Sequence, residues 1–301
     1  MSKKKVDGYA KLTSQILSQI EETGKVPWRK TWDGRGSSNE CTSMSTGNAY
    51  RGINQLYLRM LGRESKHWGT YNVIKKNGGQ IRKGEKGSIV LFYRWIDREK
   101  VKADGTVQIE TFMAGVTVNT VFNAEQADWP DGIPEKYEPV PEEEGLFDDQ
   151  EILMDAQSIL DGYLKRPGAP GFDHKGGDRA FYALQRDRVS MPRQKDFDSP
   201  EEYYSTAFHE IGHSTGHESR LKREMGGHPQ SHNYGFEELV AEFTACFLSE
   251  ESGIVDCRDN SAAYLANWAA RLKESPKMLM QAAGKASKAA EFILEGAKIE
   301  A

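Results

Sequence analysis

The chain has 301 residues, of which 38% are hydrophobic and 28% are charged. This composition is typical of a globular protein and excludes a disordered chain. No apolar run approaches the roughly 18 to 20 residues that cross a bilayer, so we expect no membrane contact. The three cysteines, with no secretory signal ahead of them, predict free thiols in a reducing compartment and therefore a cytoplasmic protein.

Charge is distributed unevenly along the chain. Residues 1–129 contain 21 Lys and Arg against 13 Asp and Glu, a net charge of +8. Residues 130–301 contain 19 against 32, a net charge of −13. Such a reversal indicates a polyanion-binding module joined to a second, different domain, although a fluctuation among solvated side chains would produce the same numbers.

A Pro-rich acidic segment lies between the two halves. It contains four prolines between residues 129 and 150, many carboxylates and little apolar periodicity. This composition is typical of an extended, solvated linker. The sequence therefore predicts a first domain over 1–129, a linker over 130–150 and a second domain over 151–301.

The N-terminal half reads as a small α+β module. Apolar residues at helical spacing predict a helix over 9–22, and further helices are expected over 49–61 and 70–76. Runs rich in β-branched and aromatic residues predict strands over 88–96 and 111–122.

The C-terminal half reads as mostly helical. Helices are expected at about 151–164, 200–215, 236–250, 262–274 and 276–294. Two short strands near 179–183 and 188–191 predict a small antiparallel sheet before the second of these helices. The fold class that the whole chain predicts is α+β, in two domains.

A metal-binding motif stands in the second of these helices. Residues four apart lie on one helix face, so His209 and His213 can aim both imidazoles at one metal ion. Glu210 projects about 100° round the helix from His209, where its carboxylate can take a proton from water as a general base. Two solvated histidines and a surface glutamate are the alternative interpretation.

A catalytic zinc site needs a third protein ligand. Glu238 and Glu242 stand four apart beside an apolar stripe of the next helix, where carboxylates are costly unless they meet a cation. We favour Glu238 as the ligand, with Glu242 hydrogen-bonding a ligand histidine; the reverse assignment stays open. His217 continues the spacing of four, but Gly216 is expected to end the helix before it. Zinc is the default for these donors, and manganese fits them as well.

Two histidines and one glutamate leave a coordination position for water, as in thermolysin-type hydrolases. The predicted reaction is hydrolysis of a peptide bond with Glu210 as the base. We expect the strand near 188–191 to offer its edge to an extended peptide substrate.

The N-terminal half also carries five of the six tryptophans, interleaved with basic residues. Proteins that bind single-stranded DNA combine a basic groove with aromatic faces on which bases stack. Trp68 and Trp95 are expected in the core, because large aromatic side chains are usually buried. The candidate DNA contacts are Trp28, Arg29, Lys30, Trp32, Tyr50, Arg51, Asn54, Lys83 and Lys86.

Several segments in this order resemble the ArdC-type antirestriction proteins of conjugative plasmids, over nearly the whole chain. They are Val26–Lys30, Tyr50–Asn54, 82–87, Val121–Gln126, Asp187–Pro192, Phe208–His217 with Arg220 and Leu221, and Glu237–Glu242. The resemblance implies a single-strand-binding domain followed by a zincin-like metallopeptidase domain. It also implies a protein that binds DNA entering a new host and counters type I restriction, whether or not peptide cleavage is needed.

Two other functions remain open at this point. One is a DNA-dependent protease that removes proteins from DNA, with DNA as its activator; in the antirestriction interpretation the metallopeptidase instead acts on a host protein or is dispensable. The other is a pure DNA-binding protein whose zinc is structural, which would require a fourth protein ligand such as His217.

Overall fold

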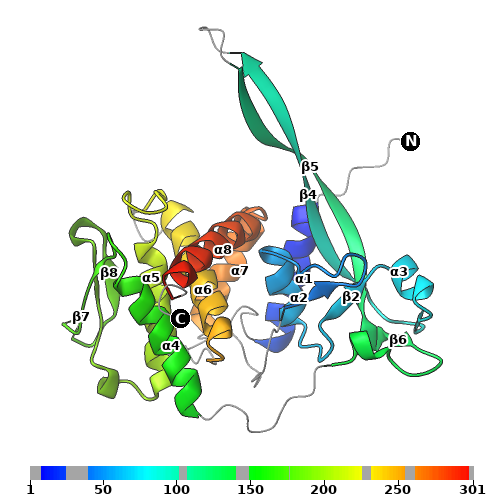
Figure 1. Ribbon diagram of the computed structural model, residues 1–301, viewed down its shortest axis with the longest axis horizontal. Coiled ribbons are helices and arrows are strands. Elements are labelled where there is room, and N and C mark those ends of the chain that lie inside the picture. The colour runs from blue at the N-terminus through cyan, green and yellow to red at the C-terminus, as the bar shows by residue number, and fades with distance from the viewer. Residues whose placement is uncertain are drawn as a thin grey trace. The chain divides into compact units, whose positions relative to one another are not determined.

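The computed structural model describes residues 8–24, 40–101, 107–139, 149–175, 177–225, 232–254 and 262–297. These residues confirm the expected α+β fold class: they form helices together with three small sheets (Figure 1). Within these ranges no helix is both long and apolar enough to span a bilayer.

The described residues form two compact units, each of which is assembled from separate segments of the sequence. The first unit comes from Met1–Gln15, Cys41–Tyr50 and Arg63–Val140. The second comes from Ile16–Glu40, Arg51–Gly62 and Pro141–Ala301, so it includes a segment of the N-terminal half. The division of the sequence at 1–129, 130–150 and 151–301 stays a prediction.

The first unit is built on a four-stranded sheet in the order β1-β2-β5-β4. Its strands are β1 (Thr42–Ser43), β2 (His67–Gly69), β4 (Ser88–Val101) and β5 (Val107–Asn123). The pair β1–β2 is parallel, and the other two pairs are antiparallel. The predicted strands 88–96 and 111–122 are therefore present but longer, because they pair with each other as one extended hairpin (Figure 1).

Smaller elements complete this unit. Helix α3 (Tyr71–Lys76) starts at Thr70, whose side chain accepts a hydrogen bond from the Val73 amide, and so satisfies one free donor of the first turn. Strands β3 (Gln80–Ile81) and β6 (Ala127–Asp128) form a two-stranded antiparallel sheet. Helix α1 (Gly8–Thr23) contributes residues to both units.

The second unit is mostly helical, as the sequence predicts. Its helices are α2 (Ile53–Met60), α4 (Asp149–Leu164), α5 (Pro200–Ser214), α6 (His232–Glu251), α7 (Ala262–Glu274) and α8 (Met278–Ala297). Tyr163, Phe208 and Ile293 are fully buried and join α4, α5 and α8 in one core. An ion pair between Arg59 of α2 and Glu250 of α6 ties α2 to this unit.

The small sheet of this unit differs from the expected antiparallel pair. Strands β8 (Phe181–Ala183) and β9 (Arg188–Ser190) are antiparallel, but β7 (Gly171–Asp173) joins the other side of β9 in parallel. The sheet is therefore mixed, and β9 lies in its centre. The expectation that the strand near 188–191 offers an edge to a substrate is wrong, because both of its sides are already paired.

Candidate metal centre

Helix α5 brings two imidazoles together. Ser199 accepts a hydrogen bond from the Glu202 amide, and Pro200 occupies the first turn, so the helix begins firmly at this point. Further along the helix the side chains of His209 and His213 lie one turn apart, with 3.2 Å between their Nε2 atoms. Their rings are nearly perpendicular, at 87°.

Helix α6 supplies the third donor, Glu238. One of its carboxylate oxygens lies 3.6 Å from His209 Nε2, and the other lies 3.5 Å from His213 Nε2. Donors bonded to zinc at about 2.1 Å in a tetrahedron are about 3.4 Å apart. The three donors therefore already have the spacing that a divalent metal ion requires, and they form the candidate metal group among the described residues.

A glycine in the motif allows α6 to approach α5. A Cβ atom at Gly212 would lie 3.2 Å from Thr244 Cβ and 3.5 Å from the Ala241 backbone. Thr244 is buried and its hydroxyl donates to the Val240 carbonyl at 2.7 Å, which holds its side chain in place. The close crossing of the two helices at this glycine is what places Glu238 opposite the histidines.

Each histidine also faces a second carboxylate through its other nitrogen. Glu242 Oε1 lies 3.9 Å from His209 Nδ1, and Glu237 Oε1 lies 3.5 Å from His213 Nδ1. Both glutamate side chains are only 6% exposed, so they lie behind the histidines rather than beside open solvent. Glu238 thus belongs to the candidate metal group, whereas Glu242 lies near His209 at a distance longer than a hydrogen bond, and the roles assigned to the two glutamates stay predictions.

The surrounding carboxylates make this a site for positive charge. Burial alone lowers the pKa of His213, but the hydrogen bond with Glu237 and the charges of Glu238 and Glu210 outweigh it and raise the pKa to about 9. The same negative charges favour a divalent cation at the two Nε2 atoms. Glu210 follows His209 on α5 and is 8% exposed, and its role as the base stays a prediction.

His217 belongs to a different cluster. The backbone leaves the helix after Ser214, and His217 Nδ1 lies 2.7 Å from Ser219 Oγ and 3.9 Å from Asp187 Oδ2. Asp187 is in turn paired with Arg220. His217 is not part of the candidate metal group, so no fourth protein ligand closes the site among the described residues.

The predicted DNA contacts fall into three sets. Trp28, Arg29, Lys30 and Trp32 lie outside the described residues. Tyr50 and Asn54 are both 7% exposed and pack inside the protein, whereas Arg51, Lys83 and Lys86 are exposed. Trp68, at 1% exposure, confirms its expected place in the core, and the side chain of Trp95 lies outside the described part.

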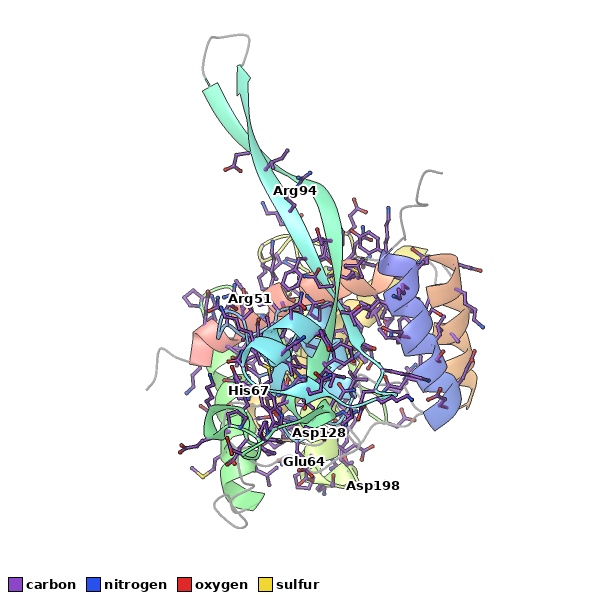
Figure 2. The ribbon with its side chains drawn as sticks, turned by 90° about the vertical axis from the view of Figure 1, so that its right-hand side faces the viewer. Arg51, Glu64, His67, Arg94, Asp128 and Asp198 are labelled. Carbon is purple, nitrogen blue, oxygen red and sulfur yellow. The ribbon has the colours of Figure 1, made fainter. Side chains whose placement is uncertain are left out.

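The hairpin has an exposed face that the sequence did not indicate. Phe92 and Ile96 of β4 are 43% and 42% exposed, and Arg94 between them is exposed and visible on the hairpin (Figure 2). Alternate residues of a strand point to one face, so Phe92 and Arg94 share it, whereas Ile96 lies beyond a shift in the pairing register between Arg94 and Trp95. Their alternation could have been found in the sequence, but their exposure could not.

Two residues behind the metal group, Glu237 and Arg223, were not predicted from the sequence as parts of the site. The Arg223 guanidinium donates to both carboxylate oxygens of Glu237, at 2.9 Å and 2.6 Å. Arg223 lies ten residues beyond the motif in an irregular segment, and no spacing rule connects it to α6.

Comparison with known proteins agrees with this architecture. Residues 6–122 match the family described as the N-terminal domain of anti-restriction factor ArdC, and residues 165–285 match the family described as zincin-like metallopeptidase. A DNA primase TraC of Escherichia coli is 34% identical over 297 residues, which are 94% of this chain and 19% of the primase. The chain thus spans only a fraction of that relative's length.

Two solved structures match nearly end to end. The metal-free crystal structure of antirestriction protein ArdC from plasmid R388 is 34% identical, with a TM-score of 0.69 over 97% of this chain and 98% of that chain. The Mn(II)-bound structure of the same protein gives a TM-score of 0.67 over 96% and 97%. The resemblance seen in the sequence is confirmed: the chain belongs to the ArdC family of antirestriction proteins, with an ArdC N-terminal domain and a zincin-like metallopeptidase domain.

Proposed function

We propose that this protein binds single-stranded DNA and protects plasmid DNA from type I restriction while the DNA enters the cytoplasm of a recipient cell. The observation that carries this proposal is the match to R388 ArdC, an antirestriction protein, over 98% of that chain. A match of this extent covers both domains, and at 34% identity it reflects more than a shared fold.

Exposed side chains of the first unit support the DNA-binding part. Lys83 and Lys86 offer charges to phosphates, and the hairpin presents Phe92 and Arg94 on one face. Such a combination suits a single strand, whose bases stack on aromatic rings while its phosphates meet cations. Duplex DNA keeps its base faces covered, so we expect it to bind more weakly.

We further propose that the second unit hydrolyses a peptide bond of a host protein. His209, His213 and Glu238 would hold a divalent ion, zinc by default, and manganese also fits these donors. Such an ion polarises a substrate carbonyl and lowers the pKa of water. Glu210 accepts the proton that the attacking water loses and passes it to the leaving amine.

A restriction assay tests the protective function. Unmodified plasmid DNA is introduced into cells that carry a type I restriction system, with or without this protein, and transformants are counted. We expect the protein to raise the count in restricting cells and to leave it unchanged in cells without the system. An equal count with and without the protein in restricting cells contradicts the proposal.

A peptidase assay separates the remaining functions. The purified protein, loaded with zinc, is incubated with an unfolded test protein, with and without single-stranded DNA. Cleavage that is independent of DNA supports a peptidase that acts alongside protection. Cleavage that appears only with DNA favours a DNA-dependent protease instead, and absence of cleavage in both cases contradicts the peptidase proposal.

A further inference from the structure

Arg223 is a buried charge directly behind the candidate metal centre. Its side chain is 3% exposed. Its Nε donates to Glu237 Oε2 at 2.9 Å, and its Nη2 donates to Glu237 Oε1 at 2.6 Å. Burying a guanidinium costs desolvation free energy unless it is paired, as here, by a bidentate ion pair. The bidentate pairing fixes the plane of the carboxylate as well as its position.

Glu237, held in this way, contacts the candidate metal ligand His213. The oxygen that faces Arg223 Nη2 also lies 3.5 Å from His213 Nδ1. A carboxylate at Nδ1 holds the proton on that nitrogen and leaves Nε2 with a free lone pair. His213 Nε2 is the atom that faces His209 and Glu238.

The same guanidinium also holds the end of α5. Arg223 Nη1 donates to Thr215 Oγ1 at 2.6 Å, and Nη2 donates to the Gly212 carbonyl at 2.8 Å. Carbonyls in the last turn of a helix have no partner within the helix, and a cation there also complements the helix dipole. Arg223 therefore contacts both the helix that carries His213 and the carboxylate that orients its ring.

We propose that Arg223 is a positioning residue for the metal centre, which acts through Glu237 to orient the His213 ring and direct its Nε2 atom at the ion. This role rests on the proposed metal site. It extends that site beyond the motif on α5 and the ligand on α6 to a residue in the segment that follows α5.

Arg220 is a matched control. Its side chain is also 3% exposed, and it also holds the end of α5, because its Nε donates to the Ser214 carbonyl at 2.8 Å. Its carboxylate partner is Asp187, which lies against His217 and not against a histidine of the metal group. Removal of either arginine takes away the ion-pair partner of one carboxylate, but only Arg223 is connected to His213.

The test measures metal affinity and stability separately, on the full chain. Zn²⁺ and Mn²⁺ affinities are obtained by competition with a chelator for the unaltered protein, Arg223→Met, Glu237→Gln, the double variant and Arg220→Met. Thermal unfolding of the same proteins is followed without metal. Glu237→Gln is nearly isosteric, so it reports on the role even where Arg223→Met does not fold.

We expect Arg223→Met and Glu237→Gln each to weaken metal binding about 10- to 100-fold. The double variant is expected to bind metal about as tightly as whichever single variant has the lower affinity. The two losses should not add, because both substitutions interrupt the same series of contacts from Arg223 through Glu237 to His213. Arg220→Met is expected to lower thermal stability but to keep the affinity of the unaltered protein.

Three results overturn the inference. They are unchanged affinity in both Arg223→Met and Glu237→Gln, an equal loss of affinity in Arg220→Met, and losses that add in the double variant. If the unaltered protein takes up neither metal, the proposed metal site fails, and this role fails with it.

Discussion

The two ring nitrogens of each candidate ligand histidine face different groups. The Nε2 atoms of His209 and His213 converge with Glu238, while their Nδ1 atoms each face another carboxylate. In this arrangement the two Nε2 atoms and Glu238 form the candidate metal group, and Glu237 is hydrogen-bonded to His213 on the other side of its ring. Glu210, the buried carboxylate of the motif, is not a member of this group, and proton transfer is the role proposed for it.

The first prediction concerns Glu210. Glu210→Gln keeps the size of the side chain but cannot accept a proton, so hydrolysis of a test protein should fall about 10²- to 10⁴-fold. Metal content, measured by mass spectrometry of the metal, and affinity for single-stranded DNA should both stay unchanged. Retention of full peptidase activity would show that another group is the base.

The second prediction concerns Asp187 and pH. Burial raises the pKa of Asp187, but its hydrogen bonds with Arg220 and Tyr182 outweigh burial and leave the pKa below the usual 3.8. Since the folded state favours the charged carboxylate, its stabilisation is complete above pH 3.8 and is lost as pH falls through the lowered folded pKa.

The measurement compares the protein with Asp187→Asn in urea. Asn tolerates the left-handed backbone found here, φ 43°, so the substitution removes mainly the charge. We expect the variant to be less stable at neutral pH by roughly 1 to 3 kcal/mol, with a difference that shrinks below pH 3.8. A difference that grows as pH falls contradicts this assignment.

At the residue scale, the sequence predicts which donor residues one helix carries, but not which residues from other segments of the chain pack against that helix. The spacing of His209 and His213 is enough to predict a pair of donors, and the apolar stripe of α6 indicates Glu238 and Glu242 as its partners. Arg223 and Glu237 are not predictable in this way, because their pairing depends on how the irregular segment after α5 folds back. Tyr50 shows the opposite error, since an aromatic residue beside an arginine suggested a DNA contact where the structure buries it.

At the element scale, the metal centre depends on the crossing of α5 and α6. Gly212→Val would place methyl groups against Thr244 and push the helices apart, so we expect a loss of about 1 to 3 kcal/mol in stability together with weaker metal binding. Gly284→Val in α8 is the control, because a Cβ there meets nothing within 4 Å. Urea unfolding and chelator competition measure both effects, and equal behaviour of the two variants contradicts the role of the crossing.

The helices are also the elements that the sequence predicts best, because their apolar periodicity is local. The predicted helix 200–215 matches α5 (Pro200–Ser214), whose cap at Ser199 is readable from the sequence. Strand β7 is not predicted, since three residues carry no periodicity and their pairing with β9 is parallel and non-local. The hairpin is longer than predicted because the backbone pairing of β4 with β5 continues through residues 97–101 and 107–111, where the sequence has little apolar periodicity.

At the scale of the whole molecule, the charge asymmetry between residues 1–129 and 130–301 is consistent with a nucleic-acid contact in the N-terminal half. Lys83→Ala combined with Lys86→Ala should weaken binding to single-stranded DNA and lower the slope of log affinity against log salt by about 2. Lys195→Ala, an exposed lysine of the second unit, is the control and should change neither. Fluorescence anisotropy at several salt concentrations measures both quantities, and an unchanged slope in the double variant contradicts a phosphate contact by this segment.

The central claim is that His209, His213 and Glu238 hold one divalent ion with Glu242 behind them. The direct test is titration of the metal-free protein with Zn²⁺, by calorimetry, on the unaltered chain, Glu238→Gln and Glu242→Gln. We expect one ion per unaltered chain, a loss of tight binding in Glu238→Gln and a weaker but measurable affinity in Glu242→Gln. An unaltered chain that takes up no ion, or a Glu238→Gln variant that binds as tightly as the unaltered protein, would contradict the account.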